Sequence, residues 1–189
     1  IKRMGLFDKT IIVFTSEHGD MFGKNGKFMR AGNTLGTFYD DVLHIPLMFR
    51  HPKLKALRVE GLVSHIDVSQ TLLDFLGLEK LISDGKSMIP LILRGEEVRK
   101  EVFAGAKLGG MEAVDIFQAS KSYVAAIRTK EWKLIEETIV DENDNSSKNI
   151  ELYDIVNDKE ELHNLKDEKQ DVLRSLQKSL NMWLRKTRK

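Results

Sequence analysis

The chain has 189 residues, of which 41% are hydrophobic and 31% charged, and its formal net charge is +1. This composition is typical of a globular protein with a core of its own, and the balanced charge argues against nucleic acid as the principal partner. No run of about 18 apolar residues is present, so no membrane-spanning helix is predicted. The lack of cysteine excludes disulfides and thiolate metal sites, and the compartment is left open.

A buried strand is predicted at residues 10–16, where four consecutive apolar residues run directly into a polar cluster. Such a run is typical of a strand in a parallel sheet, and ligands gather beyond the carboxyl ends of such strands. Glu17 and His18 lie at this end, and Gly19 lets the chain leave at an angle other residues resist. A carboxylate beside an imidazole suits a divalent metal. Two ligands do not define a site, so a loop with a capping acid and a solvated histidine is the alternative.

A long glycine-rich loop is predicted over residues 19–37, and it carries the cations Lys24, Lys27 and Arg30. Loops of this length within compact domains are usually functional or disordered. The three cations are therefore either anion-binding residues or solvated side chains. A second buried strand is predicted at residues 44–50, where Pro46 near the start is tolerated.

A short strand at residues 62–65 and a helix from Asp67 to Leu76 are predicted next. Asp67 is the expected N-cap and Gly77 the expected stop. The apolar face of this helix is expected to consist of Ile66, Leu72, Leu73 and Leu76. Residues 79–100 are predicted to be mostly connector.

The second half of the chain has the pattern of a small antiparallel sheet covered by a helix. Short strands are predicted at 102–104, 123–128, 132–135 and 152–155, and the helix at about 168–185. We expect Leu173, Leu176 and Leu180 to be buried on its apolar stripe. This change of character places a domain boundary between residues 98 and 99.

Five blocks of the sequence, in order, resemble the C-terminal portion of sulfatases in the alkaline-phosphatase-like superfamily. The first, Thr-Ser-Glu-His-Gly-Asp-Met-Phe-Gly, is similar to the Thr-Ser-Asp-His-Gly-Glu/Asp-x-x-Gly signature. The later blocks resemble the Y-E…V-P-L segment, the V-S-x-x-D…T-L-L-D block, the D-G-x-S…P-L…G block and the closing R-T-x-x-W-K…E-L-Y-D…N-L pattern. They lie within residues 15–23, 37–47, 63–74, 84–95 and 126–165.

The resemblance implies an α/β fold: part of an alkaline-phosphatase-like mixed or parallel sheet, then a small antiparallel sheet packed on a C-terminal helix. Residues 1–98 would be the C-terminal part of the catalytic domain with its metal-site loop, and residues 99–189 a small α+β subdomain. Sulfatases make their formylglycine nucleophile from a Cys/Ser-x-Pro-x-Arg motif, and this motif is absent here. The nucleophile is therefore expected upstream, and the isolated chain is expected to be inactive.

The resemblance also implies roles for individual residues. Glu17 and His18 align with metal ligands, although Asp is usual at the position of Glu17. Ca²⁺ is the common metal of the family, while an imidazole ligand favours Mn²⁺ or Zn²⁺. Arg30 aligns with an anion-binding lysine of some members and is preferred over Lys24 and Lys27, because a guanidinium offers paired donors to sulfate oxygens.

The resemblance predicts that the full-length protein is a sulfuric ester hydrolase acting on a small-molecule or carbohydrate sulfate ester, with the rest of the polypeptide upstream. A phosphodiesterase or phosphonate monoester hydrolase of the same superfamily is the first alternative, because it uses a similar ligand pair. A non-catalytic binding or structural domain is the second alternative.

Overall fold

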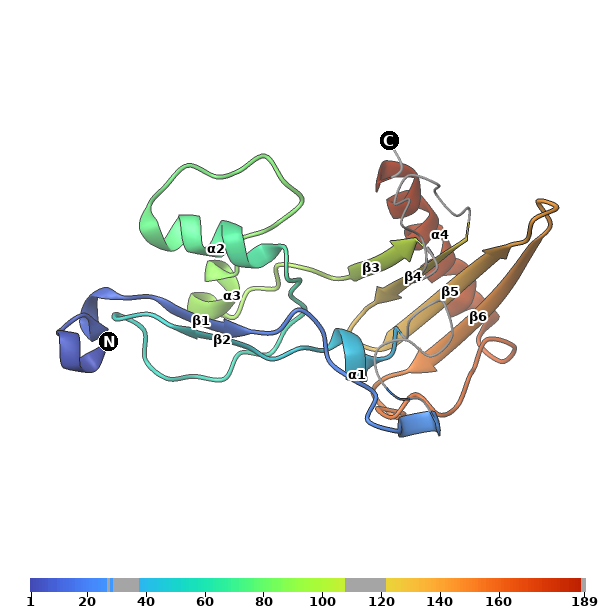
Figure 1. Ribbon diagram of the computed structural model, residues 1–189, viewed down its shortest axis with the longest axis horizontal. Helices are drawn as coiled ribbons and strands as arrows, with labels where there is room; N and C mark the ends of the chain where they lie inside the picture. The colour runs from blue at the N-terminus through green and yellow to red at the C-terminus, as the bar shows by residue number, and fades with distance from the viewer. Residues whose placement is uncertain (27, 29–37, 108–121, 188–189) are drawn as a thin grey trace. The chain divides into compact units, whose positions relative to one another are not determined.

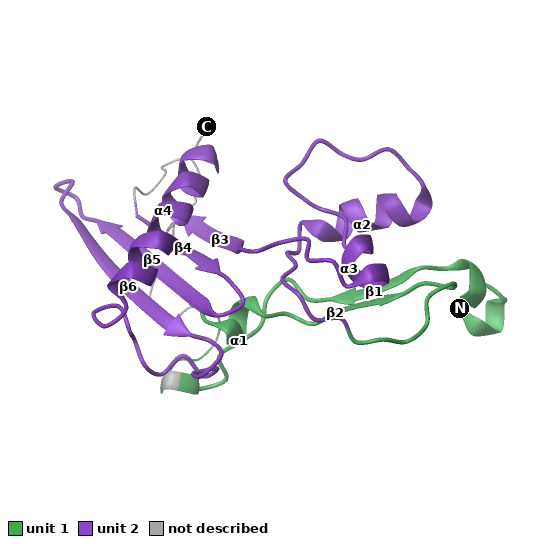
Figure 2. Ribbon diagram, turned by 180° about the vertical axis from the view of Figure 1, so that it is seen from behind, with its two compact units in different colours: residues 1–58 green, residues 59–189 purple. Residues whose placement is uncertain are grey.

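The computed structural model describes the chain except residues 27, 29–37, 108–121 and 188–189 (Figure 1). The described residues form two compact units, residues 1–58 and residues 59–189 (Figure 2). Within the described part of the chain, no helix is both long and apolar enough to cross a membrane. The α/β fold class predicted from the sequence is confirmed.

The described part of unit 1 contains a two-stranded sheet and four short helical segments. Strands β1 (Ile12–Thr15) and β2 (Leu47–Arg50) pair antiparallel, so that Phe14 lies opposite Met48. The helical segments are η1 (Lys2–Met4), η2 (Phe7–Lys9), η3 (Lys24–Gly26) and α1 (Asp40–Leu43).

The antiparallel pairing corrects the expectation of a parallel, fully covered strand at residues 10–16. Phe14 and Met48 are each 56% exposed, so this face of the β1–β2 pair is open in the part of the chain described here. An apolar run predicts a buried strand, but it gives neither the direction of the neighbouring strand nor the segment that covers it.

Unit 2 begins with two helices, α2 (Asp67–Leu76) and α3 (Ile89–Arg94). The helix α2 ends at Leu76 as predicted, and Gly77 follows it in the left-handed conformation. Its N-cap residue is Ile66, which corrects the prediction of Asp67 as the N-cap: Asp67 is the first residue of the helix, and its carboxylate accepts a hydrogen bond from the backbone N–H of Ser64. Residues 62–65 do not form the predicted strand. The prediction that residues 79–100 are mostly connector missed α3, a helix with Pro90 in its first turn and left-handed Gly95 after its end.

The face that α2 buries is polar, which corrects the predicted apolar face. Asp67, Gln70 and Thr71 are its buried residues, while Ile66 and Leu76 are exposed. The polar side chains are tolerated there because each forms hydrogen bonds. Gln70 Nε2 donates to the carbonyl of Leu81, and Thr71 Oγ1 donates to the carbonyl of Asp67.

In the described part of unit 2, a four-stranded antiparallel sheet in the order β3-β4-β5-β6 follows these helices. Its strands are β3 (Val102–Lys107), β4 (Tyr123–Arg128), β5 (Trp132–Val140) and β6 (Ser146–Asp154), and α4 (Gln170–Thr187) packs against it. Figure 1 shows α4 crossing one face of the sheet. The core between helix and sheet consists of Ala125, Ile127, Leu134, Leu152, Leu173, Leu176 and Leu180. The sheet-plus-helix prediction, including the three buried leucines of α4, is confirmed.

Candidate metal site in the loop after strand β1

The carboxylate of Glu17 and the imidazole of His18 lie side by side in the loop that follows β1. Glu17 Oε1 is 3.3 Å from His18 Nε2, and the imidazole is the less exposed of the two groups. Two ligands of one metal ion, each bonded at about 2.0–2.2 Å, lie at a comparable separation from one another. The geometry therefore allows both groups to bind the same ion.

One hydrogen bond orients the imidazole of His18. Its Nδ1 lies 2.7 Å from the carbonyl oxygen of Gly19. Because a carbonyl oxygen can only accept, Nδ1 must carry the proton and donate it. In the neutral ring this leaves the lone pair on Nε2, the atom that faces Glu17. Nε2 is therefore the nitrogen available to a metal ion.

Gly19 is held against the backbone of α1. Its N–H donates to the carbonyl of Val42 at 2.8 Å. A Cβ on Gly19 would lie 1.9 Å from the carbonyl oxygen of Asp41, a separation at which no side chain fits. Gly19 was predicted to serve through an unusual backbone angle, but it is not among the described glycines with positive φ. Close approach of two backbone segments is what requires glycine at this position.

Two of the three candidate cations lie outside the described residues: Lys27 and Arg30. Lys24 is described, and its Nζ lies 2.6 Å from Asp41 Oδ2, with both side chains partly buried. Among the described residues no group of three or more His, Cys, Asp or Glu side chains is arranged to hold a metal ion. Within the described residues, Glu17 and His18 alone do not make up a complete set of metal ligands.

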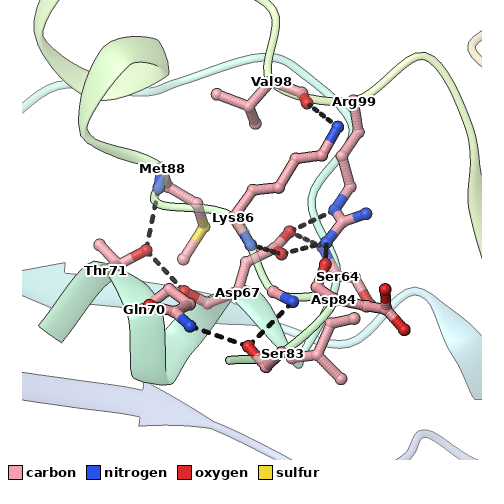
Figure 3. A network of polar contacts seen from close by, with 12 residues as sticks. Ser64, Asp67, Gln70, Thr71, Ser83, Asp84, Lys86, Met88, Val98 and Arg99 are labelled. Atoms are coloured by element: carbon pink, nitrogen blue, oxygen red, sulfur yellow. Dashed lines mark hydrogen bonds and ion pairs between the residues drawn. The ribbon is translucent and has the colours of Figure 1, made fainter. Parts of the chain in front are cut away.

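A second polar cluster, at the start of α2, is a structural one (Figure 3). The carboxylate of Asp67 accepts hydrogen bonds from the backbone N–H groups of Ser64 and Lys86 and from the guanidinium of Arg99. Arg99 also donates to the carbonyl of Asp84 at 2.8 Å. The cluster joins the start of α2 to the segments on either side of α3. Only a capping role was expected for Asp67 from the sequence, because Lys86 and Arg99 are distant from it in the chain.

Comparison with protein families identifies the chain over most of its length. Residues 36–189 match the family described as N-sulphoglucosamine sulphohydrolase, C-terminal. Arylsulfatase K of Bos taurus is 27% identical over 186 residues, which cover 95% of this chain and 32% of that protein. The chain thus spans about a third of the length of this curated relative.

Two solved structures share the fold of this chain over nearly its whole length. BT4656, solved in complex with its substrate D-glucosamine-2-N,6-O-disulfate, is similar with a TM-score of 0.68 at 28% identity, over 97% of this chain and 36% of that one. The phosphonate monoester hydrolase of Agrobacterium radiobacter is similar with a TM-score of 0.72 at 25% identity, over 99% of this chain and 37% of that one. The resemblance read from the sequence motifs is confirmed, and the chain belongs to the sulfatases, as a C-terminal portion of the N-sulphoglucosamine sulphohydrolase type.

Proposed function

We propose that this chain is the C-terminal part of a sulfuric ester hydrolase whose formylglycine nucleophile lies in the polypeptide upstream. The observation that carries the proposal is the Glu17–His18 pair, 3.3 Å apart at the end of β1, in a chain of the sulfatase family. The proposed substrate is a sulfate ester of a small molecule or a carbohydrate. The sulfated glucosamine bound by BT4656 supports the carbohydrate option.

The donors of the Glu17–His18 pair fit a divalent cation. Glu17 supplies an anionic oxygen, and His18 supplies Nε2. The hydrogen bond from Nδ1 to the Gly19 carbonyl keeps the proton on Nδ1, so the lone pair of the neutral ring is on Nε2. A bound cation would act as a Lewis acid toward the sulfate ester and its attacking nucleophile. Ca²⁺ is expected from the family, and the imidazole favours Mn²⁺ or Zn²⁺. Glu17 carries one methylene more than the usual Asp, which moves its carboxylate by roughly one bond length, about 1.5 Å.

Arg30 is the proposed residue for binding the sulfate group. Its planar guanidinium can donate two parallel hydrogen bonds to a tetrahedral anion. Lys24 is a weaker candidate, because its ammonium group is already paired with Asp41 at 2.6 Å. Lys27 remains a weaker candidate for binding the anion than Arg30, as in the sequence analysis.

The proposal is tested in the full-length protein by His18→Ala, with His163→Ala as the control for an exposed histidine elsewhere. Metal content per chain is measured by elemental mass spectrometry, and turnover is measured with an aryl sulfate. We expect His18→Ala to lose the metal and most of the turnover, and His163→Ala to keep both. Full metal content and full turnover in His18→Ala would overturn the proposed site.

A phosphonate monoester hydrolase is the second candidate, supported by the similarity to the Agrobacterium radiobacter enzyme. The two activities are separated by comparing kcat/KM of the full-length protein for an aryl sulfate and for an aryl phosphonate monoester. A preference for the sulfate supports the first candidate, and a preference for the phosphonate supports the second. Absence of metal binding and of both activities would favour a non-catalytic binding domain.

A further inference from the structure

We propose that α1 is the positioning element of the Glu17–His18 pair, and that Gly19 and Asp41 are the positioning residues through which it acts. This inference rests on the proposed function, since it assigns these residues to the geometry of the same metal site. Neither residue contacts a metal or substrate in this scheme. Each acts by fixing the loop that carries the two donors.

Gly19 connects the imidazole directly to α1 through its two peptide groups. Its N–H donates to the carbonyl of Val42 at 2.8 Å, and its carbonyl accepts from Nδ1 of His18 at 2.7 Å. A two-bond chain therefore runs from the α1 backbone to the ring. Because the second bond also determines which ring nitrogen carries the proton, the position of α1 affects both the orientation and the tautomer of the imidazole.

The contact between Gly19 and α1 leaves no room for adjustment. A Cβ at Gly19 would meet the carbonyl oxygen of Asp41 at 1.9 Å and its carbonyl carbon at 3.0 Å. Both are backbone atoms, so no rotamer change can relieve the overlap. An alanine at this position must push the loop away from α1 and break the hydrogen bond from Gly19 to Val42.

Asp41 holds the loop at a second point. Its carbonyl lies against Gly19, while its carboxylate pairs with Lys24, five residues further along the loop. Both side chains of the ion pair are partly buried, which reduces solvent screening. The segment between Gly19 and Lys24 is thus attached to α1 at both ends, one residue after the metal donors.

The test uses the full-length protein with Gly19→Ala, Asp41→Asn and Asp41→Glu, and with Gly26→Ala as the matched control. Gly26 lies in the same loop and has positive φ, but a Cβ there meets nothing within 4 Å. An alanine at Gly26 therefore strains the loop without contacting α1. The Kd of the divalent metal is measured by competition with a chromophoric chelator. The His18 tautomer is read from ¹⁵N chemical shifts in the metal-free protein.

We expect Gly19→Ala to weaken metal binding by about 10- to 100-fold, the usual effect of removing an outer-shell partner of a metal ligand, and to abolish the Nδ1–H signature of His18. Asp41→Asn is expected to weaken metal binding less, because its backbone carbonyl remains, and Asp41→Glu is expected to restore it. Gly26→Ala is expected to lower the Tm while keeping the wild-type Kd.

Different results identify which proposal fails. If the wild-type protein binds no metal, the proposed function fails, while the ¹⁵N signature still tests the positioning of His18. If the wild-type protein binds metal and Gly19→Ala binds it equally well with an unchanged tautomer, the positioning role of α1 is wrong. If Gly19→Ala does not fold, Asp41→Asn provides the test. An unchanged Kd for the metal in Asp41→Asn contradicts the proposal. Weaker metal binding in Asp41→Asn that is restored in Asp41→Glu supports it.

Discussion

The carboxylate of Asp67 accepts a hydrogen bond from Nε of Arg99 at 2.7 Å across 32 residues of sequence. Asp67 is fully buried and Arg99 nearly so. Two backbone N–H groups, of Ser64 and Lys86, complete the hydrogen bonding of the carboxylate. A buried charge with this many donors is stable only while all of them stay in place.

Asp67→Ala should therefore lower the free energy of unfolding by about 3–5 kcal/mol, because it leaves the guanidinium of Arg99 without its carboxylate. The measurement is chemical denaturation followed by circular dichroism. Asp74→Ala, in the same helix but outside the cluster, is the control and should change stability much less. Equal effects of the two substitutions would show that the cluster does not stabilise the fold.

The buried ion pair between Lys133 and Glu161 gives a second stability prediction. Both side chains are 0% exposed, and Nζ lies 2.8 Å from Oε1. Lys133→Met should cost about 3–5 kcal/mol, because the Glu161 carboxylate remains buried without its cationic partner. The double variant with Glu161→Gln should recover part of this loss, and a double-mutant cycle measures the coupling. Strictly additive effects would contradict this account.

The contact between α4 and the sheet predicts a large effect of truncating its central leucine. Leu176 is buried in the core formed with Ile127 and Leu134. Leu176→Ala should destabilise unit 2 by about 2–5 kcal/mol through lost burial and the cavity left behind. Ser175→Ala, at an exposed position of the same helix, should have little effect. Fast amide exchange throughout α4 in the wild-type protein would show that the helix is detached and would contradict the prediction.

The ion pair between Asp84 and Lys186 is expected to depend on pH. Lys186 Nζ lies 2.5 Å from Asp84 Oδ1, and this hydrogen bond lowers the pKa of Asp84 below its ordinary value of 3.8. A lowered folded-state pKa means that the contact stabilises the protein above the unfolded pKa and is lost as the pH falls through the folded one. In Lys186→Met, NMR titration should show the pKa of Asp84 rising toward 3.8. An unchanged titration would show that the contact does not form in solution.

Under the proposed function, the formylglycine lies upstream and Glu17 and His18 supply only part of the metal's ligands. We therefore expect the 189-residue chain alone not to hydrolyse aryl sulfates, and the full-length protein with a matured formylglycine to do so. In the full-length protein, Arg30→Ala should lower kcat/KM by the equivalent of about 2–4 kcal/mol, because the guanidinium supplies part of the charge stabilisation. Arg30→Lys should lose less, since it keeps the charge but not the paired donors. Turnover by the isolated chain would show that its site is complete.

Local patterns were sufficient to predict the sheet-plus-helix half of the chain. Short strands joined by polar turns, and leucines at helical spacing in α4, are signals carried by neighbouring residues. The helix α3 was not predicted, because its six residues are too few to show a helical period in the sequence. Pro90 in its first turn and Gly95 after its end are the signals that could have identified it. The buried face of α2 was mispredicted because its polar residues are satisfied by partners far along the chain.

The candidate site likewise has a part that the sequence predicts and a part that it does not. The adjacency of Glu17 and His18 follows from their position in the sequence, whereas the contact of Gly19 with Asp41 is a long-range one that no local pattern encodes. The roles of these donors and of Arg30, which lies outside the described residues, stay predictions.

Because α4 comes after its sheet in the chain, the sheet cannot be covered by this helix until the helix has been synthesised. All four strands of its sheet leave the ribosome before the helix does, so the face formed by Ala125, Ile127, Leu134 and Leu152 is uncovered until residue 180 has emerged. An uncovered apolar face of this kind associates readily with other chains. A nascent chain interrupted between β6 and α4 is therefore expected to aggregate or to be captured by chaperones, while a chain that includes α4 is expected to escape both.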